Sequence, residues 1–199
     1  MRQRATQVDG TRRRITEAAV RLHTTVGPSE ASFAAVAEAA GVTRLTLYRH
    51  FASRDELFAA CMSHWRAAHP PPTPGKWAEV RSFEARLRRA VAELYAWYAE
   101  NHADLYPIYR DAAFTPAATH RARRESIEVM ADAILAPSGA PARHLVRAAI
   151  GHVLGFWAWR SLAVEEGCSH AQAVELAARF VLAAAEGSRQ RDSRRRPRG

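Results

Sequence analysis

The sequence predicts an all-α fold in two domains. Apolar residues recur at three- and four-residue spacings along most of the 199 residues, which is typical of amphipathic helices. No stretch alternates apolar and polar residues as a half-buried β-strand would. We expect about nine helices: a three-helix helix-turn-helix domain at the N-terminus, followed by a larger helical domain.

The composition divides the chain into four segments. Four prolines and a glycine lie between residues 70 and 75. They should end a helix, because proline lacks an amide donor and disfavours a helical conformation in the preceding residue. The last twelve residues are polar and basic, with too little apolar surface to order themselves. We predict a helix-turn-helix domain with its connecting helix at 1–69, a linker at 70–76, a second domain at 77–187 and a disordered basic tail at 188–199.

The first helix is predicted from Thr11 to Val26. Gly27 and Pro28 follow it and should end it. Residues 1–10 lack a helical period, so we expect them to be disordered. We expect a mobile basic arm with a non-specific role, formed by Arg2, Arg4, Arg12, Arg13 and Arg14. The apolar face of this helix consists of Ile15, Ala19, Leu22 and Val26.

Residues 32–54 have the layout of a helix-turn-helix. Ser32 is placed to cap a first short helix, and Gly41 should end it, because a residue without a Cβ can leave the right-handed helix. Thr43 is placed to cap a second short helix. The inward positions are Phe33, Val36, Ala37 and Ala40 on the first helix and Leu47 and Phe51 on the second, which leaves Arg44, Leu45, Thr46, Tyr48 and Arg49 outside.

The outward side chains of this second helix suit DNA. Arginine pairs bidentately with guanine edges, and hydroxyl groups position phosphates. The alternative is an amphipathic hairpin inside a helical bundle, since arginine and tyrosine occur on any solvated helix face.

Further helices account for the rest of the chain. A fourth begins at Ser53, whose hydroxyl and Glu56 should form a capping box. The remaining helices are predicted at Trp77–Asn101, Ala103–Phe114 (opened or interrupted by Pro107), Pro116–Leu135, Ala142–Glu166 and Ser169–Gly187.

The net charge of +9 is concentrated at the two ends of the chain. Residues 1–66 carry +4 and residues 188–199 carry +5, whereas residues 67–187 are neutral overall. A basic N-terminal domain fits a polyanionic partner. A neutral central domain fits a second copy of the chain or a small molecule.

Catalytic, metal-binding and membrane functions find little support. The longest apolar stretch, Ala148–Val164, is interrupted by charge and falls short of the roughly 20 residues of a membrane span. The nine histidines and two cysteines lack metal-ligand spacing, and no nucleophile or phosphate-loop motif occurs. We predict no catalytic residue, no metal and no cofactor, in a soluble cytoplasmic protein without a membrane partner.

Residues 37–57 resemble the DNA-binding signature of TetR-family transcriptional regulators. They read Ala-Glu-Ala-Ala-Gly-Val-Thr-Arg-Leu-Thr-Leu-Tyr-Arg-His-Phe, then Ala-Ser-Arg-Asp-Glu-Leu. The length, the N-terminal position of the motif and the helical remainder match this family as well. The chain departs from the family pattern at Leu45, where a small residue is frequent, and at Ala35, where an acidic residue is frequent.

The resemblance implies which residues meet DNA. Thr43, Arg44 and Leu45 would approach base edges. Phosphates would be touched by Thr46, Tyr48, His50 and Arg54. The alternatives are that His50 is a partly buried residue bridging helices and that Tyr48 is a core aromatic. The DNA-binding residues so implied are Thr43, Arg44, Leu45, Thr46, Tyr48, Arg49, His50 and Arg54.

A strip of small residues within 145–164 predicts a dimer interface. On a helical wheel this strip would let another helix approach closely, and with the alanine-rich last helix it fits half of a four-helix interface. Packing within one chain is the alternative, and Trp157, on another side of the helix, is a further interface candidate. The predicted interface residues are Ala148, Gly151, Gly155, Ala158, Leu162, Ala177, Phe180, Val181 and Ala184.

Aromatic residues of the second domain are the candidates for an effector site. Cavities in helical bundles are largely apolar, with a few polar groups that orient the ligand. The alternative is that these side chains simply fill the core. The predicted ligand-binding residues are Trp97, Tyr98, Tyr106, Tyr109, Phe114, Met130, His152, Phe156 and Trp159.

We therefore expect a homodimeric repressor that binds a palindromic operator in double-stranded DNA and is released by a small-molecule effector. Two copies are needed because one short helix reads only a few base pairs. Repression rather than activation, and transmission of motion through the fourth helix, are implied by the resemblance alone. The alternatives are a constitutive or architectural DNA-binding dimer without ligand control, and a helical enzyme or small-molecule carrier.

Overall fold

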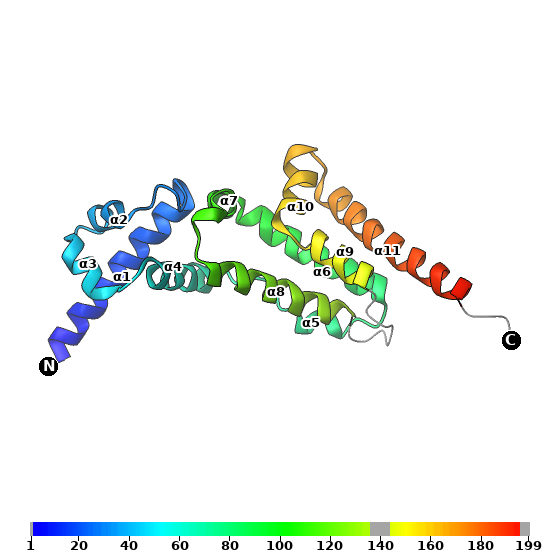
Figure 1. Ribbon diagram of the computed structural model, residues 1–199, viewed down its shortest axis with the longest axis horizontal. Helices are drawn as coiled ribbons and strands as arrows, with labels where there is room; N and C mark the ends of the chain where they lie inside the picture. The colour runs from blue at the N-terminus through cyan, green and yellow to red at the C-terminus, as the bar shows by residue number, and fades with distance from the viewer. Residues whose placement is uncertain (1, 136–143, 196–199) are drawn as a thin grey trace. The chain divides into compact units, whose positions relative to one another are not determined.

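The computed structural model describes residues 2–135 and 144–195, with side chains for 9–135 and 144–187. In these ranges the chain forms eleven α-helices and no β-strand, which confirms the all-α prediction (Figure 1). It has two compact units, Met1–Pro70 with Asn101–Ala122, and Pro71–Glu100 with Arg123–Gly199. Among the helices described, none is long and apolar enough to span a membrane.

The first unit is built around α1, which packs against α2, α4 and α7. Its core contains both predicted inward residues of the second motif helix, Leu47 and Phe51, which are completely buried. Val26, by contrast, is 44% exposed and does not belong to the buried face of α1. The elements of this unit are α1 (Arg2–Thr25), α2 (Phe33–Ala39), α3 (Arg44–His50), α4 (Arg54–Ala68), α7 (His102–Arg110) and a 3₁₀ turn at Ala112–Phe114.

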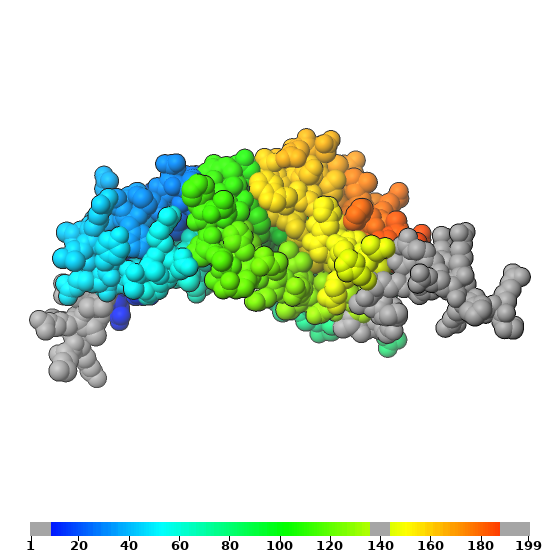
Figure 2. Space-filling model, viewed as in Figure 1, coloured from blue at the N-terminus to red at the C-terminus, as the bar shows by residue number. Residues whose placement is uncertain are grey.

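The second unit is organised by α11, which packs against α6 and α9. Its surface includes α10 and α11, drawn in orange and orange-red in Figure 2. The first residues of α8 belong to the first unit and the rest to this one. The elements are α5 (Gly75–Ala78), α6 (Phe83–Glu100), α8 (Ala117–Leu135), α9 (His144–Val153), α10 (Phe156–Arg160), a π-helical turn at Ser161–Glu165 and α11 (His170–Arg195).

Several predicted helix ends differ from the structure. The helix α1 begins at Arg2 instead of Thr11, because extending an existing helix costs little and the added residues include good helix formers. The predicted helix at 77–101 is divided into α5 and α6, where Ser82 accepts from the Ala85 amide at 3.3 Å. The last helix continues past Gly187 to Arg195, and residues 196–199 of the predicted tail lie outside the described residues.

The predicted helix at 142–166 is broken at Gly155. This residue has an extended backbone, with ψ of 143°. Two buried tyrosines of α6 donate hydrogen bonds to the backbone carbonyls just before the break. The Tyr95 hydroxyl donates to the Val153 carbonyl and the Tyr98 hydroxyl donates to the Leu154 carbonyl, both at 2.9 Å. Carbonyls at a helix end need such partners when buried. The small residues predicted to form one straight strip therefore lie on two separate helices.

Residues 101–122, which we predicted to belong to the second domain, pack in the first unit. A carboxylate with little exposure explains much of this packing. Asp111 accepts from the Ser29 amide at 3.1 Å and from the Ser29 hydroxyl at 2.5 Å, and Arg110 donates to Asp111 at 2.7 Å and to the Val26 carbonyl at 2.8 Å. The hydrogen bonds from Arg110 and Ser29 hold the pKa of Asp111 well below its usual value. We call this group, Asp111 with Arg110, Ser29 and the Val26–Gly27 backbone, the Asp111 clasp.

Candidate DNA-binding site

The turn between α2 and α3 is held by local hydrogen bonds. Ser32 accepts from the Ala35 amide at 3.2 Å and thereby caps α2. At the C-terminal end of α2, the Gly41 amide donates to the Glu38 backbone carbonyl at 3.0 Å and the Val42 amide donates to the Ala37 backbone carbonyl at 2.9 Å. These two bonds form a Schellman motif. Gly41 has φ of 63°, a conformation that glycine adopts without a steric penalty. The predicted cap and turn residues are thus confirmed.

The helix α3 presents a mixed polar and apolar face to solvent. Thr43 caps α3 by accepting from the Thr46 amide at 3.1 Å, and the two threonine hydroxyls lie 2.9 Å apart. Leu45 is 71% exposed. Arg44 and Arg49 are exposed as well, and within the described part of the chain no hydrogen bond or ion pair holds either guanidinium. Both arginines are available to another molecule.

Tyr48 is supported from beneath by an aromatic contact. Its ring lies 5.1 Å from that of Phe33, between centroids, at a tilt of 51°, while 55% of the residue stays exposed. The alternative that Tyr48 is a core aromatic is therefore wrong. Its hydroxyl end projects from the same surface as the α3 arginines, as the polar face of the helix predicts.

Arg12 fixes α3 and α4 to α1. It donates to the His50 carbonyl and, at 3.1 Å, to Glu56, and its guanidinium lies 4.1 Å above the Phe51 ring. Glu56 also accepts from the Ala52 amide at 2.9 Å. The Ala52 amide and Arg12 lower the pKa of Glu56. Arg12 is therefore an anchor of the recognition helix, and assigning it to a mobile basic arm was wrong.

The two remaining DNA-binding candidates differ from the rest. His50 is half-buried at the end of α3. Arg54 is the first residue of α4 and is exposed overall, but its side chain also lines a cavity in the first unit. Ser53 caps α4 by accepting from the Glu56 amide at 3.1 Å. The Glu56 carboxylate in turn accepts from the Ala52 amide and not from the Ser53 amide.

Comparison with known proteins places the motif in a family. A family model for bacterial regulatory proteins of the tetR family matches residues 15–61, the segment that contains α2 and α3. The N-terminal part of the chain therefore carries a DNA-binding domain of the TetR family. Regulators of this family bind DNA through the helix-turn-helix and are not enzymes.

Solved structures share the fold of the chain over most of its length. A TetR-like transcriptional regulator from Rhodococcus sp. RHA1 has 22% identity and a TM-score of 0.61, over 89% of this chain and 96% of that chain. A tetR-family transcriptional regulator from Streptomyces coelicolor has 20% identity and a TM-score of 0.59, over 89% of this chain and 80% of that chain. No curated protein sequence matches the chain.

The predicted effector residues are distributed over both compact units of the chain. Tyr106, Tyr109 and Phe114 belong to the first unit and the others to the second. Tyr98, Phe156 and Trp159 are at most 4% exposed and pack on one another at ring-centroid distances of 5.5–5.7 Å. The Tyr98 hydroxyl is bonded to Leu154. In the described structure these three residues therefore belong to the buried core of the second unit.

The other effector candidates are scattered. Met130 is buried and Trp97 is half-buried beside Tyr98. His152 is exposed, contacts Phe180 at a ring-centroid distance of 5.6 Å and lines a groove in the second unit. Phe114 is 58% exposed and lines a cavity, but in the first unit.

The predicted dimer residues divide between surface and core. Ala177 and Val181 are 2% and 0% exposed, since α11 packs against α6 and α9 on that side. Phe180 is 54% exposed and Ala148 is exposed. The half-buried members of the set are Gly151, Gly155, Ala158, Leu162 and Ala184.

The sequence did not identify Arg12 as a residue that supports α3. Arg12 donates hydrogen bonds to His50, which is 38 residues away in the sequence, and to Glu56, which is 44 residues away. No local sequence pattern predicts such contacts.

In the described ranges, no group of three or more histidine, cysteine, aspartate and glutamate side chains could hold a metal ion.

Proposed function

We propose that this TetR-family regulator acts as a homodimer that binds a palindromic operator through the two copies of α3. The observation that carries the proposal is the exposed face of α3, where Arg44, Leu45 and Arg49 stand on a capped and anchored helix. A rigid support matters because base contacts must be held in register by the scaffold. A small-molecule effector then favours another spacing of the two helices and lowers the affinity for DNA, by no more than its preference for one state.

Replacing Arg44 with alanine should weaken operator binding by about 1–3 kcal/mol, the value of one bidentate base contact. Arg44 is exposed in the first turn of α3, where recognition helices contact base edges. The measurement is a fluorescence-anisotropy titration of the selected operator and of a scrambled duplex at fixed salt.

Arg66→Ala is the matched control for the loss of one positive charge. Arg66 is exposed near the end of α4, away from α3. We expect it to affect both duplexes equally, whereas Arg44→Ala should reduce the preference for the operator. An equal loss for operator and scrambled duplex in Arg44→Ala would mean that Arg44 reads no base.

An exposed apolar groove in the second unit supports dimerisation. Trp157, Leu176 and Phe180 line it and are 48%, 48% and 54% exposed. Contiguous apolar surface of this kind usually marks an interaction site, whereas isolated exposed apolar residues do not. Ala158 and Leu162 from the predicted interface line the same groove. We propose that a second copy of the chain covers it.

Phe180→Glu should therefore dissociate the dimer. The carboxylate enters a symmetric interface twice, and loss of an aromatic anchor costs about 2 kcal/mol or more per site, so we expect the dimer Kd to rise by at least about 30-fold. Sedimentation equilibrium measures it. Val129→Glu is the control, since Val129 is 59% exposed on α8 and is not part of the groove. A Phe180→Glu protein that dimerises like the wild type would exclude this groove as the interface.

A constitutive dimer is the second candidate function, and one observation favours it. The aromatic residues predicted to hold an effector in the second unit pack tightly on one another. The two functions differ in whether any compound that binds the purified protein lowers its affinity for the operator. A compound that lowers this affinity supports effector control. If no member of a diverse set of small aromatic and aliphatic compounds lowers it, the constitutive dimer is supported.

A further inference from the structure

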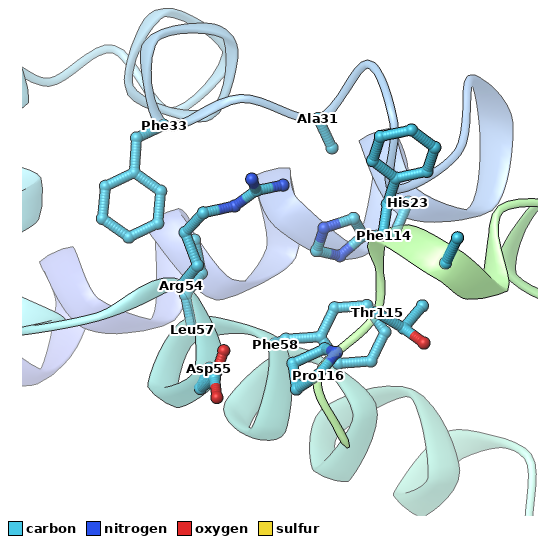
Figure 3. A pocket seen from close by; sticks show the side chains of 11 residues that line it. His23, Ala31, Phe33, Arg54, Asp55, Leu57, Phe58, Phe114, Thr115 and Pro116 are labelled. Atoms are coloured by element: carbon cyan, nitrogen blue, oxygen red, sulfur yellow. The ribbon is translucent and has the colours of Figure 1, made fainter. Parts of the chain in front are cut away.

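The first unit contains a cavity that neither the helix-turn-helix nor the dimer groove accounts for. It has a volume of about 260 Å³ and lies between the end of α1, the start of α4 and the turn that follows α7 (Figure 3). Its lining is His23, Ala31, Phe33, Arg54, Asp55, Leu57, Phe58, Ala113, Phe114, Thr115 and Pro116. The volume is at the small end of ligand sites, which suits a molecule of about one ring.

The walls of the cavity present polar and apolar surface in about equal parts, and the apolar part includes three phenylalanines. Phe33 comes from α2, Phe58 from α4 and Phe114 from the turn after α7. Phe58 is 4% exposed and Phe114 is 58% exposed, so one ring forms part of the interior and the other lies at the mouth. Aromatic rings on several sides favour a flat apolar body as the occupant.

The side chain of Arg54 brings a cation to this cavity. Figure 3 shows the Arg54 guanidinium between the Phe33 ring and His23, and throughout the described residues no hydrogen bond or ion pair fixes it. His23 is buried with a pKa lowered to about 4, by burial and by the nearby Arg54 charge, so it is neutral at pH 7. The Asp55 carboxylate points away from the guanidinium in Figure 3. A single cation with a carboxylate nearby favours a monoanion over a dianion.

We propose that this cavity binds a small aromatic monocarboxylate, with its ring among the phenylalanines and its carboxylate on the Arg54 guanidinium. The planar guanidinium matches a carboxylate through two parallel hydrogen bonds. The same guanidinium is the first side chain of α4 and, under the proposed function, contacts a DNA phosphate. A carboxylate bound here therefore competes with DNA for Arg54 and couples ligand binding to operator release.

Benzoate is the probe, and binding is measured first without DNA. We follow the Arg54 Nε–H and phenylalanine ring signals by NMR and expect saturable shifts with a Kd on the order of 1 mM, typical of a ligand with so few atoms. Benzyl alcohol, which keeps the ring and lacks the charge, should bind at least about tenfold more weakly. Inorganic phosphate, which lacks the ring, should not saturate the same signals.

Two variants measure separately how the charge of Arg54 and the ring of Phe114 contribute to benzoate affinity. Arg54→Gln should weaken benzoate binding roughly tenfold, and Phe114→Ala should weaken it roughly fivefold through lost apolar contact. Phe114 lies outside the DNA-binding set, and its exposure at the mouth makes the substitution compatible with folding. Equal affinity for benzoate and benzyl alcohol, tighter binding of phosphate, or unchanged benzoate affinity in both variants would overturn the proposal.

The link to DNA rests on the proposed function and is tested separately. In wild type, saturating benzoate should raise the operator Kd at least about threefold relative to the same concentration of sodium chloride, and in Phe114→Ala the increase should largely disappear. If benzoate binds but does not affect the operator Kd, the site stands and the competition for Arg54 is wrong. If benzoate binds a protein that has no preferred duplex, the proposed function fails and the site stands.

Discussion

Replacing Gly27 with alanine should destabilise the first unit by about 3 kcal/mol. Gly27 has φ of 101°, and a left-handed backbone costs an L residue about 1–2 kcal/mol. A Cβ at this position would overlap an Asp111 carboxylate oxygen and lie 2.6 Å from an Arg110 nitrogen. It would therefore displace the Asp111 clasp, whose hydrogen bonds to a charged group contribute about 1.5–3 kcal/mol each.

Hydrogen exchange of the α1 and α7 amides, together with urea unfolding, measures this loss. Gly41→Ala is the matched control, because Gly41 has φ of 63° and no atom within 4 Å of a built Cβ. Gly41→Ala should lower the free energy of unfolding by about 1 kcal/mol, the cost of a left-handed backbone at an alanine. If the two alanine variants lose the same stability, the close approach of Asp111 to Gly27 contributes nothing.

Acidification should destabilise the protein through His23. The imidazole is 5% exposed, and burial, followed by the Arg54 charge, lowers its pKa to about 4 from an ordinary 6.5. Between these two values the unfolded chain binds a proton that the folded chain does not, so stability is lost as the pH falls from 6.5 to 4 and levels off below 4. The shift corresponds to about 3 kcal/mol.

His23→Phe isolates this contribution, because it keeps a ring against Phe58, whose centroid lies 4.9 Å from that of His23, and cannot bind a proton. Urea unfolding at pH 7 and pH 4 should show a smaller acid-induced loss in the variant, by about 3 kcal/mol. Substitution of the exposed His64 by phenylalanine controls for removal of one histidine. An acid-induced loss identical to that of wild type would show that His23 does not govern the pH dependence.

The neighbouring thiol of His23 does not complicate this measurement. Cys61 lies 3.2 Å from the His23 ring nitrogen, measured to Sγ, and burial raises its pKa to about 12. It therefore stays protonated throughout the pH range used, and it reacts slowly because the thiolate is the nucleophile.

The features that could be predicted from the sequence are the local ones. Ser32, Gly41 and Thr43 cap and turn the helices through hydrogen bonds to residues within five positions. Their effect depends on neighbours that the sequence displays directly. Leu47 and Phe51 are buried because their four-residue spacing places them on one face of α3 and its end. The helix-turn-helix was therefore predicted well, including most of its exposed face.

The features that failed depend on distant partners. Ser29 and Asp111 are 82 residues apart, and their bond places residues 101–122 in the first unit instead of the second. Tyr95 and Tyr98 reach carbonyls more than fifty residues away at the broken helix. Helical periodicity shows that an aromatic residue is inward, but not whether it lines a cavity or fills the core.

The most direct test of the central claim is the selection of bound duplexes from a random DNA library by the purified wild-type chain, in parallel with Arg44→Ala. If two copies of α3 read an operator, the enriched sequences should converge on an inverted repeat, with half-sites about one helical turn, or a multiple of it, apart. The variant should lose the consensus at specific positions in both halves. Enrichment of no sequence over random duplex, or of a single half-site without its inverted partner, would contradict the account.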